Sequence, residues 1–505
     1  MREALAVLLP ACAVAVFLLP DRLRWRSSLA AAAIALGLGL GFSSLLSTAL
    51  IAGGIAATSI GFVAIDAALW VSVAAVGWWL RLRKPVTTLP SLAGAQARGE
   101  TSLDLGDRVP VRQAKAGDLH RPSANDPRTD LTDRLLRFAF GTAAIVAFIS
   151  VMTSSAALPH GDWDAWAIWN QHARFLFRGG GSDEWRALFS IRWSQPDYPL
   201  LLPASVARVW AYAGHESTFG PAFIAMVFGM ASVVLVVTTL RGRVAWIAGT
   251  LILAASAFLT QVASQCADVP LAFFILAALA VACGDGLHWQ GHRTGALVAG
   301  ALSGMAAWTK NEGLVFVLLM AIVAVAVTVR PSRPGHDSDT RVRLRPFAPW
   351  RGRAVEQAWW GMVGALPVVI ALAWFKLSLA PSSGLVEGQS LSVIASRLLD
   401  PGRHAAVAVL MVQHAIRWSG PVAIAIFPLS GLAAIGVAIR GGGVVRTMTI
   451  VLGMMLLSYY LVYVMSPFDV TWHVSTSVDR LLVHLWPSLV LIVGIGLTGH
   501  VSRLS

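Results

Sequence analysis

The stretch SLAAAAIALGLGLGFSSLLSTAL, residues 28–50, carries no charged side chain and decides the fold class. About 20 mostly apolar residues suffice for one helix to cross the hydrocarbon core of a bilayer. Apolar windows of this kind recur at residues 4–20, 28–50, 62–80, 138–158, 219–240, 244–262, 269–284, 295–309, 314–329, 358–379, 421–439, 447–465 and 481–499. We therefore expect an all-α polytopic membrane protein with about thirteen transmembrane helices.

The composition supports this fold class and excludes others. Of 505 residues, 56% are hydrophobic and only 13% are charged, and the mean hydropathy is +0.68. The net charge of +13 gathers in short loops between the windows, where Lys and Arg set membrane topology, so we expect no nucleic-acid partner. Cys12, Cys266 and Cys283 have no paired spacing and predict neither a disulfide framework nor a zinc site.

The basic loops predict the orientation of the chain. With the N-terminus outside, the loops DRLRWR (21–26), RLRK (81–84), RGR (241–243) and 330–353 all lie in the cytoplasm. The first window also has the length of a signal peptide, with ACAVA (11–15) as a cleavage region, but the basic loop after it favours a retained anchor. Residues 159–218 then form the longest outside segment, and 380–420 and 466–480 face the same compartment.

Three parts follow from this threading. Residues 1–84 form an N-terminal unit of three spans. Residues 85–133 are rich in Pro, Gly, Asp and Arg without hydrophobic periodicity, which is typical of a disordered cytoplasmic linker. Residues 134–499 form the larger transmembrane domain, including the external loop 159–218. In that loop we expect an interfacial helix whose apolar side chains lie along the membrane and whose polar ones face water: Trp166, Trp169, Phe175 and Phe177 against Asn170, Gln171 and Arg174.

The sequence HGDWDAWAIWN (160–170) places two carboxylates among tryptophans at the end of a predicted span. Carboxylates near a bilayer are costly unless they are solvated, paired or bound to a cation. Asp162 or Asp164 could deprotonate an acceptor hydroxyl, and the two together could hold a divalent cation such as Mg²⁺ or Mn²⁺. The alternative is a helix cap beside an aromatic belt.

Two further stretches carry acidic residues on the outer side. In SQPDYPLLLP (194–203), Asp197 and Tyr198 lie between prolines on a stiffened backbone, as a substrate contact or as a turn leading into a helix. In SQCADVPLAFF (264–274), Asp268 precedes Pro270, which suits the N-cap of a helix. The same position also allows Asp268 to face an external site.

Basic residues interrupt two apolar stretches on the same side. In GMAAWTKNEGLVF (304–316), Lys310 and Glu312 lie at a predicted outer turn. An external Lys runs against the positive-inside tendency, and its ammonium could neutralise a phosphate leaving group; the alternative is a Lys–Glu pair at a tight turn.

In DVTWHVSTSVDRLLVHLWP (469–487), Arg480 is expected to open the last span, with His473 nearby as a second phosphate donor. Asp479 is interpreted as an N-cap or, with Arg480, as an interface anchor, and His484 as a buried histidine of the bundle.

Residues 134–499 resemble bacterial membrane-embedded GT-C glycosyltransferases, relatives of protein O-mannosyltransferases and lipid A aminoarabinose transferases. The resemblance lies in the order of GDWDAWAIWN (161–170), DYPLLLP (197–203), ADVPLAFF (267–274), GMAAWTKNEG (304–313) and DRLLVHLWP (479–487). The loop lacks the Asp-Glu pair usual in the mannosyltransferases, and Asp197 stands where the aminoarabinose enzymes usually have lysine. No Walker loop, zincin pattern or dinucleotide-binding glycine fingerprint competes with it.

The resemblance implies inverting transfer of a sugar from a polyprenyl-phosphate donor to an envelope acceptor, which is a lipid, a glycan or a protein. It places the reaction on the outer face of the bacterial cytoplasmic membrane, among membrane lipids, with no cofactor beyond the optional divalent cation. By position, Asp162 is the base or acceptor-orienting group and Asp164 its neighbour. Lys310, Arg480 and His473 would hold the donor phosphate, and the substrate pocket would be lined by Asp197, Tyr198, Asp268 and Glu312.

Two other functions use the same residues. A transporter or lipid flippase would line its path with them, but it favours charges near mid-span and symmetric halves, and the sequence shows no internal repeat. A non-catalytic assembly protein would use the external loop to bind a partner.

Overall fold

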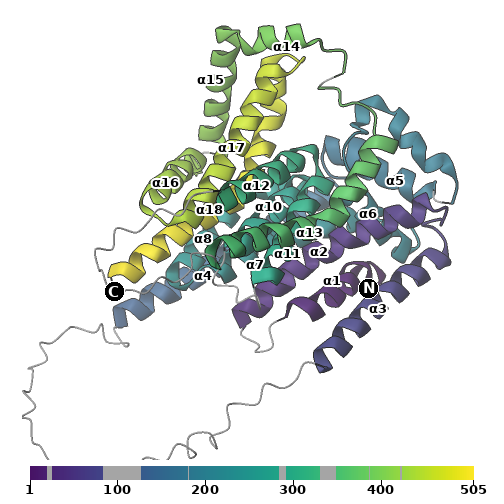
Figure 1. Cartoon of the computed structure of the whole chain (residues 1–505), viewed down its shortest axis with the longest axis horizontal. Coiled ribbons are helices and arrows are strands. Elements are labelled where there is room, and N and C mark those ends of the chain that lie inside the picture. Colours follow the sequence, from purple (N-terminus) through teal and green to yellow (C-terminus); the bar gives the residue numbers. More distant parts are fainter. Residues whose placement is uncertain are drawn as a thin grey trace, which may run out of the picture.

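The computed structural model describes residues 1–19, 25–83, 127–179, 181–283, 292–329, 349–385, 387–420 and 423–504. Within these ranges the regular structure is entirely helical (Figure 1). The predicted all-α fold class is therefore confirmed.

The helices follow one another along the chain with short connections. They are α1 (Arg2–Leu18), α2 (Trp25–Ala52), α3 (Ile60–Leu82), α4 (Pro127–Ala157), the π-helix η2 (Ala165–Trp169), α5 (Asn170–Arg178), the 3₁₀-helices η3 (Asp183–Ser190) and η4 (Arg192–Ser194), α6 (Leu201–Ala213), α7 (Phe219–Thr239), α8 (Gly242–Ala254), α9 (Ser256–Ala263), α10 (Asp268–Cys283), α11 (His292–Thr309), α12 (Asn311–Val329), α13 (Pro349–Ser378), α14 (Leu391–Leu398), α15 (Pro401–Arg417), α16 (Ile426–Arg440), α17 (Gly443–Met465) and α18 (Val470–Leu504).

Seven helices within the described ranges are long and apolar enough to cross a membrane: α2, α3, α4, α7, α13, α17 and α18. The pair α8 and α9 makes an eighth if its two parts, bent by 62°, form one broken span. All thirteen predicted windows fall largely on helices, but thirteen spans are not confirmed. Hydropathy measures apolar content, whereas α10, α12 and α16 are shorter than the roughly 20 residues that a full span needs.

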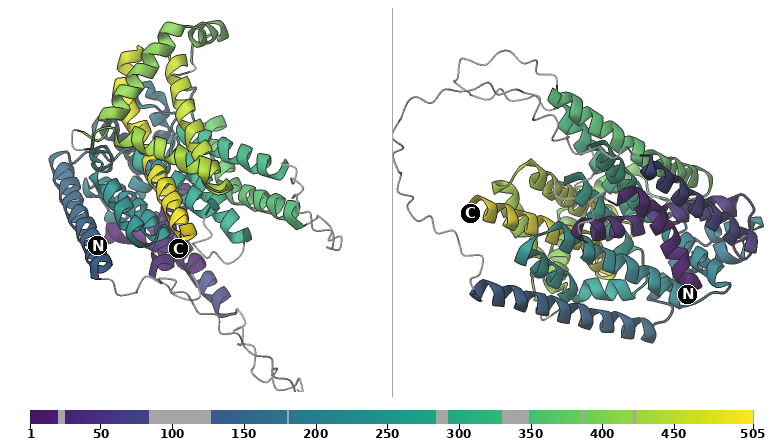
Figure 2. Two further views of the ribbon diagram at one scale, coloured as in Figure 1. Left: turned by 90° about the vertical axis from the view of Figure 1, so that its left-hand side faces the viewer. Right: turned by 90° about the horizontal axis from the view of Figure 1, so that it is seen from below.

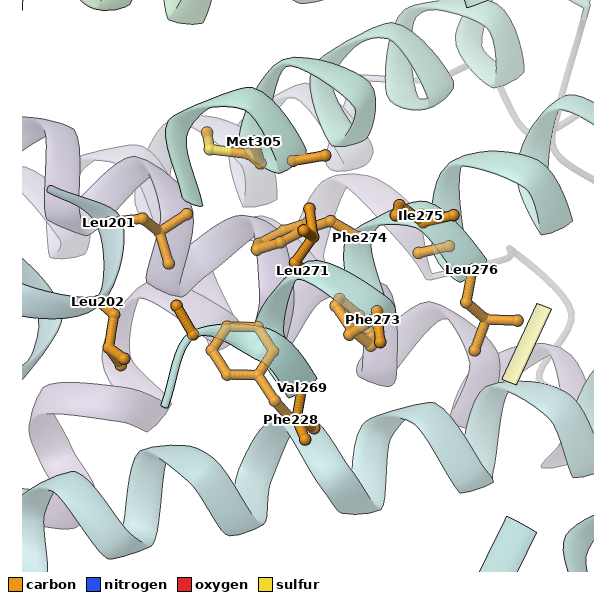
Figure 3. Packing of buried hydrophobic residues seen from close by; sticks show 14 of the residues in the cluster. Leu201, Leu202, Phe228, Val269, Leu271, Phe273, Phe274, Ile275, Leu276 and Met305 are labelled. Atoms are coloured by element: carbon orange, nitrogen blue, oxygen red, sulfur yellow. The ribbon is translucent and has the colours of Figure 1, made fainter. Parts of the chain in front are cut away.

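Helix α10 forms the centre of the bundle. It contacts α7, α11 and α18, and nearly all its side chains are buried. Figure 3 shows its aromatic face, where the rings of Phe273 and Phe274 lie 5.5 Å from that of Phe228 on α7. Protein rather than lipid therefore surrounds this apolar helix, which places its first residue, Asp268, inside the molecule.

The N-terminal unit packs into the same core. Helices α1 and α2 contact α6, and α2 also contacts α7. The guanidinium of Arg208 on α6 binds the carboxylate of Asp66 on α3 at 2.6 Å, and both side chains are buried. Residues 84–126 of the predicted linker lie outside the described residues, and residues 127–133 already belong to α4, which runs along the outside of the bundle (Figure 2).

Helices α11 and α13 approach closely because glycines face the partner backbone. A Cβ added to Gly300 would lie 1.9 Å from the carbonyl oxygen of Gly361, and one added to Gly364 would lie 1.9 Å from that of Leu297. Small residues of this kind let helix backbones touch in membrane proteins. The contact fixes the position of Lys376 in the last turn of α13.

The segment that follows α4 folds onto the bundle rather than lying flat. Trp169, Phe177 and Asn170 are buried, while Trp166 is 47% exposed. The expected interfacial arrangement is therefore wrong for these three buried residues. The physical reason is that α5 packs against α6, a helix buried along almost its whole length.

Candidate functional site

Asp268, the first residue of α10, is the centre of a buried polar cluster. Its Oδ1 accepts hydrogen bonds from Nζ of Lys310 and Nε2 of His484, each at 2.8 Å. A carboxylate only accepts, so Nε2 of His484 carries the proton, and its Nδ1 is free to accept from the hydroxyl of Tyr459 at 3.1 Å. The second oxygen of Asp268, Oδ2, is buried without a partner among the described residues.

Lys310 lies at the break between α11 and α12. Its Nζ is 3.3 Å from Oε1 of Glu312 and 5.6 Å from the ring centre of Tyr198. The turn is sharp because Gly313 meets the preceding helix, where a Cβ would lie 1.9 Å from the carbonyl oxygen of Ala306. The lysine predicted at an outer turn thus points into the protein and is 4% exposed.

Arg480 joins the last helix to the segment after α4. Its guanidinium donates to Oδ2 of Asp164, the residue just before the π-helix η2, and its charge also acts on Asp268. Nε of Arg480 is buried without a partner in the described ranges. Arg480 therefore lies between two carboxylates and still has a donor to offer.

The loop that carries Asp162 and Asp164 is held by the residues before α10. The amide of Asp162 donates to the carbonyl of Ser264 at 3.1 Å, and Asn170 donates to the side chain of Gln265 at 3.4 Å. Gly161 makes this contact with a φ of +75°, and a Cβ there would lie 2.5 Å from the Ser264 oxygen. Glycine is therefore required both by the backbone conformation and by the space.

A second part of the cluster links the loop before α6 to α12 and α13. Nδ2 of Asn311 donates to Oδ2 of Asp197 at 2.7 Å, and Oδ1 of Asn311 accepts from Nζ of Lys376 at 2.7 Å. Lys376 also donates to the backbone carbonyl of Asp197. Its ammonium is thus held by two uncharged oxygens.

Tyr198 lies between the two parts. Its ring stacks on Trp169 with ring centres 5.3 Å apart, and burial raises the pKa of its hydroxyl, so the phenol stays neutral at physiological pH. The stack holds the PDYP segment against the π-helix.

The structure brings together most of the predicted site residues, in one connected cluster: Asp164, Asp197, Tyr198, Asp268, Lys310, Glu312 and Arg480. Asp162 is exposed beside this cluster, and its carboxylate accepts from the amide of Trp163 at 2.8 Å. His473 binds Oγ of Ser466 at 2.8 Å and packs on Tyr463, so no described contact joins it to Arg480.

Two interpretations of the sequence are corrected. Arg480 does not open the last helix, because α18 begins at Val470, and Asp479 within it is not an N-cap. The backbone carbonyl of Asp479 instead accepts from Trp418, and its side chain binds His414 at 3.2 Å. His484 is a buried histidine as expected, but it belongs to the cluster.

The residues present do not form a divalent-cation site. Among the described residues there is no group of three or more His, Cys, Asp or Glu side chains that could hold a metal ion. Asp164 is occupied by Arg480, and Asp162 lies exposed. Carboxylate ligands already bound to a guanidinium are poor partners for Mg²⁺ or Mn²⁺.

Sequence reasoning missed Asn311, Lys376 and Tyr459. Lys376 ends an apolar window on the predicted outer side, so the charge rule that singled out Lys310 applies to it equally. Asn311 is the residue after Lys310. Tyr459 lies within an apolar span, and no local pattern distinguishes it from other packing residues.

The cluster can bind an anion without being an empty basic pocket. Lys310, Lys376 and Arg480 each carry several N–H groups. The nearby carboxylates orient them, and the unpartnered Nε of Arg480 can donate to a ligand oxygen. Comparison with family models, curated proteins and solved structures found no match for this chain.

Proposed function

We propose that this protein is an inverting glycosyltransferase that moves a sugar from a polyprenyl-phosphate donor to an envelope acceptor. The observation that carries the proposal is the convergence of Lys310 and Arg480 on Asp268 at one end of a helical membrane bundle. Both cations approach a carboxylate loop that precedes a π-helix, an element frequent at functional sites.

The cations suit the leaving group of such a reaction. When the bond between the sugar C1 and the phosphate oxygen breaks, negative charge develops on polyprenyl phosphate. Oriented N–H donors in a water-poor site stabilise that charge far better than water does. Lys310 uses two of its three N–H donors on Asp268 and Glu312, and Arg480 keeps Nε free, so each has a donor for the phosphate.

The two carboxylates of the loop divide the remaining work. Asp164 holds Arg480 in place. Asp162 is exposed and has no ion-pair partner among the described residues, so it is our candidate for the base. The acceptor hydroxyl oxygen attacks C1 from the face opposite the phosphate, Asp162 takes its proton, and polyprenyl phosphate leaves with the bonding electron pair.

The proposed setting is the outer face of the cytoplasmic membrane of a bacterium, with membrane lipids around the bundle. Cysteine labelling in a cysteine-free background tests the orientation. Cysteine at Ser182, an exposed residue beside the loop, should react with an impermeant reagent from outside, and cysteine at exposed Arg241 should not.

The transfer itself is tested in proteoliposomes that contain the full chain, a polyprenyl-phosphate sugar and an envelope acceptor fraction. Asp162→Asn should lower turnover about 10²- to 10⁴-fold, the usual worth of a positioned base, while the protein stays folded. Lys310→Ala and Arg480→Ala should reduce donor use more than acceptor use. Undiminished transfer by Asp162→Asn removes the assignment of the base, and no transfer from any such donor removes the proposal.

One observation favours transport as an alternative. Helices α8 and α9 form a broken pair bent by 62°, and broken helices next to buried charges are typical of transporters. A transporter or flippase would move a lipid-linked sugar across sealed proteoliposomes without cleaving it. Retention of the intact lipid-linked sugar, with a change only in its sidedness, would favour this alternative.

A further inference from the structure

A second binding site lies beside the loop carboxylates. A pocket of about 110 Å³ is lined by Trp166, Ala167, Gln171, Arg174 and Trp193. Trp166 and Ala167 belong to η2, which begins directly after Asp164, and Trp193 lies in η4. None of these five residues takes part in the polar cluster around Asp268.

The π-helix explains why the pocket has an aromatic wall. Trp166 and Trp169 lie in the same short element, yet Trp166 is 47% exposed and Trp169 is buried in the core. Trp193 is 58% exposed. Two large flat side chains are thus held open to solvent by an element whose other tryptophan anchors it.

Polar groups complete the edge of the pocket. Oε1 of Gln171 is buried without a partner among the described residues. Nε of Arg174 lies 3.3 Å from Glu216, which leaves the rest of the guanidinium able to donate while its charge is largely compensated. An apolar face bordered by an amide and a charge-compensated guanidinium suits a ligand with an apolar face and a rim of hydroxyl groups.

We propose that this pocket binds a sugar ring of the acceptor. A pyranose offers its C–H face to an indole and its hydroxyls to amide and guanidinium groups, and the volume suits one ring. A lipid phosphate is less well matched, because Glu216 already neutralises the cation in the pocket. The proposal rests on the proposed function, which supplies an acceptor, and it places that acceptor next to Asp162 and Asp164.

Binding is measurable without transfer. Saturation-transfer NMR on the full chain in detergent would use methyl α-D-mannopyranoside, methyl β-D-glucopyranoside and methyl β-D-galactopyranoside as probes. At least one of the three should bind, and Trp166→Ala and Trp193→Ala should each weaken it about tenfold, since a stacked aromatic face contributes on this scale. Trp472→Ala is the matched control, because Trp472 is 57% exposed and lies at the start of α18, outside the pocket.

A second pair of variants separates sugar binding from seating in the membrane. Trp193→Phe keeps a flat ring and should retain most of the binding, whereas Trp193→Leu keeps apolar area and should lose it. Equal tolerance of Phe and Leu, equal loss in Trp472→Ala, no binding of any glycoside, or displacement of the glycoside by dioctanoyl phosphatidylglycerol would each overturn the proposal.

Failure of this site and failure of the proposed function give different results. Asp162→Asn should bind the glycoside as the unmodified chain does, because Asp162 does not line the pocket. Glycoside binding without transfer by the unmodified chain would remove the transferase and keep the sugar site. Transfer with unchanged acceptor KM in Trp166→Ala and Trp193→Ala would keep the transferase and remove this site.

Discussion

The ammonium of Lys310 lies 2.8 Å from Oδ1 of Asp268, and both side chains are buried. The lysine comes from a sharp turn between two helices and the aspartate from the start of the central helix. Neither could be buried alone, because an isolated charge in the protein interior is very costly. Their pairing therefore makes the site both a chemical and a structural element.

Removing one partner of this pair should destabilise the protein strongly. Lys310→Met leaves Asp268 buried with a bond only from His484, and loss of one partner of a buried pair costs about 3–5 kcal/mol. Chemical unfolding in mixed micelles measures the change. The double variant Lys310→Met with Asp268→Leu should recover part of the loss.

The matched control for this prediction is the exposed pair of Arg293 and Glu356, whose side chains are 68% and 38% exposed. Arg293→Ala should change the unfolding free energy by less than about 1 kcal/mol. An equal loss in Arg293→Ala and Lys310→Met would contradict the role of burial.

The pair of Asp66 and Arg208 should hold the N-terminal helices on the rest of the chain. Arg208 also donates to the carbonyl of Ala6, and Tyr212 donates to Asp66 at 2.6 Å, so α1, α3 and α6 meet at one buried network. If the chain is expressed as two pieces divided within residues 85–126, the pieces should copurify. Arg208→Met should reduce copurification severalfold, and unchanged recovery would show that apolar packing alone suffices.

Stability should depend on pH through His172. Burial lowers the pKa of His172 from 6.5 to about 4. Between these values the unfolded chain binds a proton that the folded chain does not, so stability falls as pH decreases from about 6.5 to about 4, by about 2–4 kcal/mol. Unfolding of His172→Gln should show a weaker pH dependence over this range. His215→Gln, at an exposed position, serves as the control and should keep the dependence of the unmodified chain.

Gly161→Ala should displace the carboxylate loop. Gly161 has a φ of +75°, a conformation that costs other residues about 1–2 kcal/mol, and the added Cβ would meet the Ser264 oxygen at 2.5 Å. We expect lower stability and loss of transfer, because Asp162 and Asp164 follow directly. Gly141→Ala in α4, where no atom lies within 4 Å of the added Cβ, should be tolerated. Full transfer by Gly161→Ala would mean that the loop position is not critical.

Local patterns predicted the helices better than their roles. The apolar windows fall on helices because apolar length is recorded in consecutive residues. The span count differs because a window cannot tell lipid from protein as the neighbour. Helix α10 is as apolar as a span, yet it is short and its side chains face other helices.

The sequence by itself determined the helical membrane class and the outer positions of the polar stretches around Asp164, Asp197, Asp268, Lys310 and Arg480. Only the tertiary structure decided which of these side chains meet. Arg480 reaches Asp164 across 316 residues, and Asn311 and Lys376 enter the site through the close contact of α11 with α13. The reason is physical: hydrophobic periodicity is local, whereas the pairing of buried charges depends on how helices distant in the chain pack.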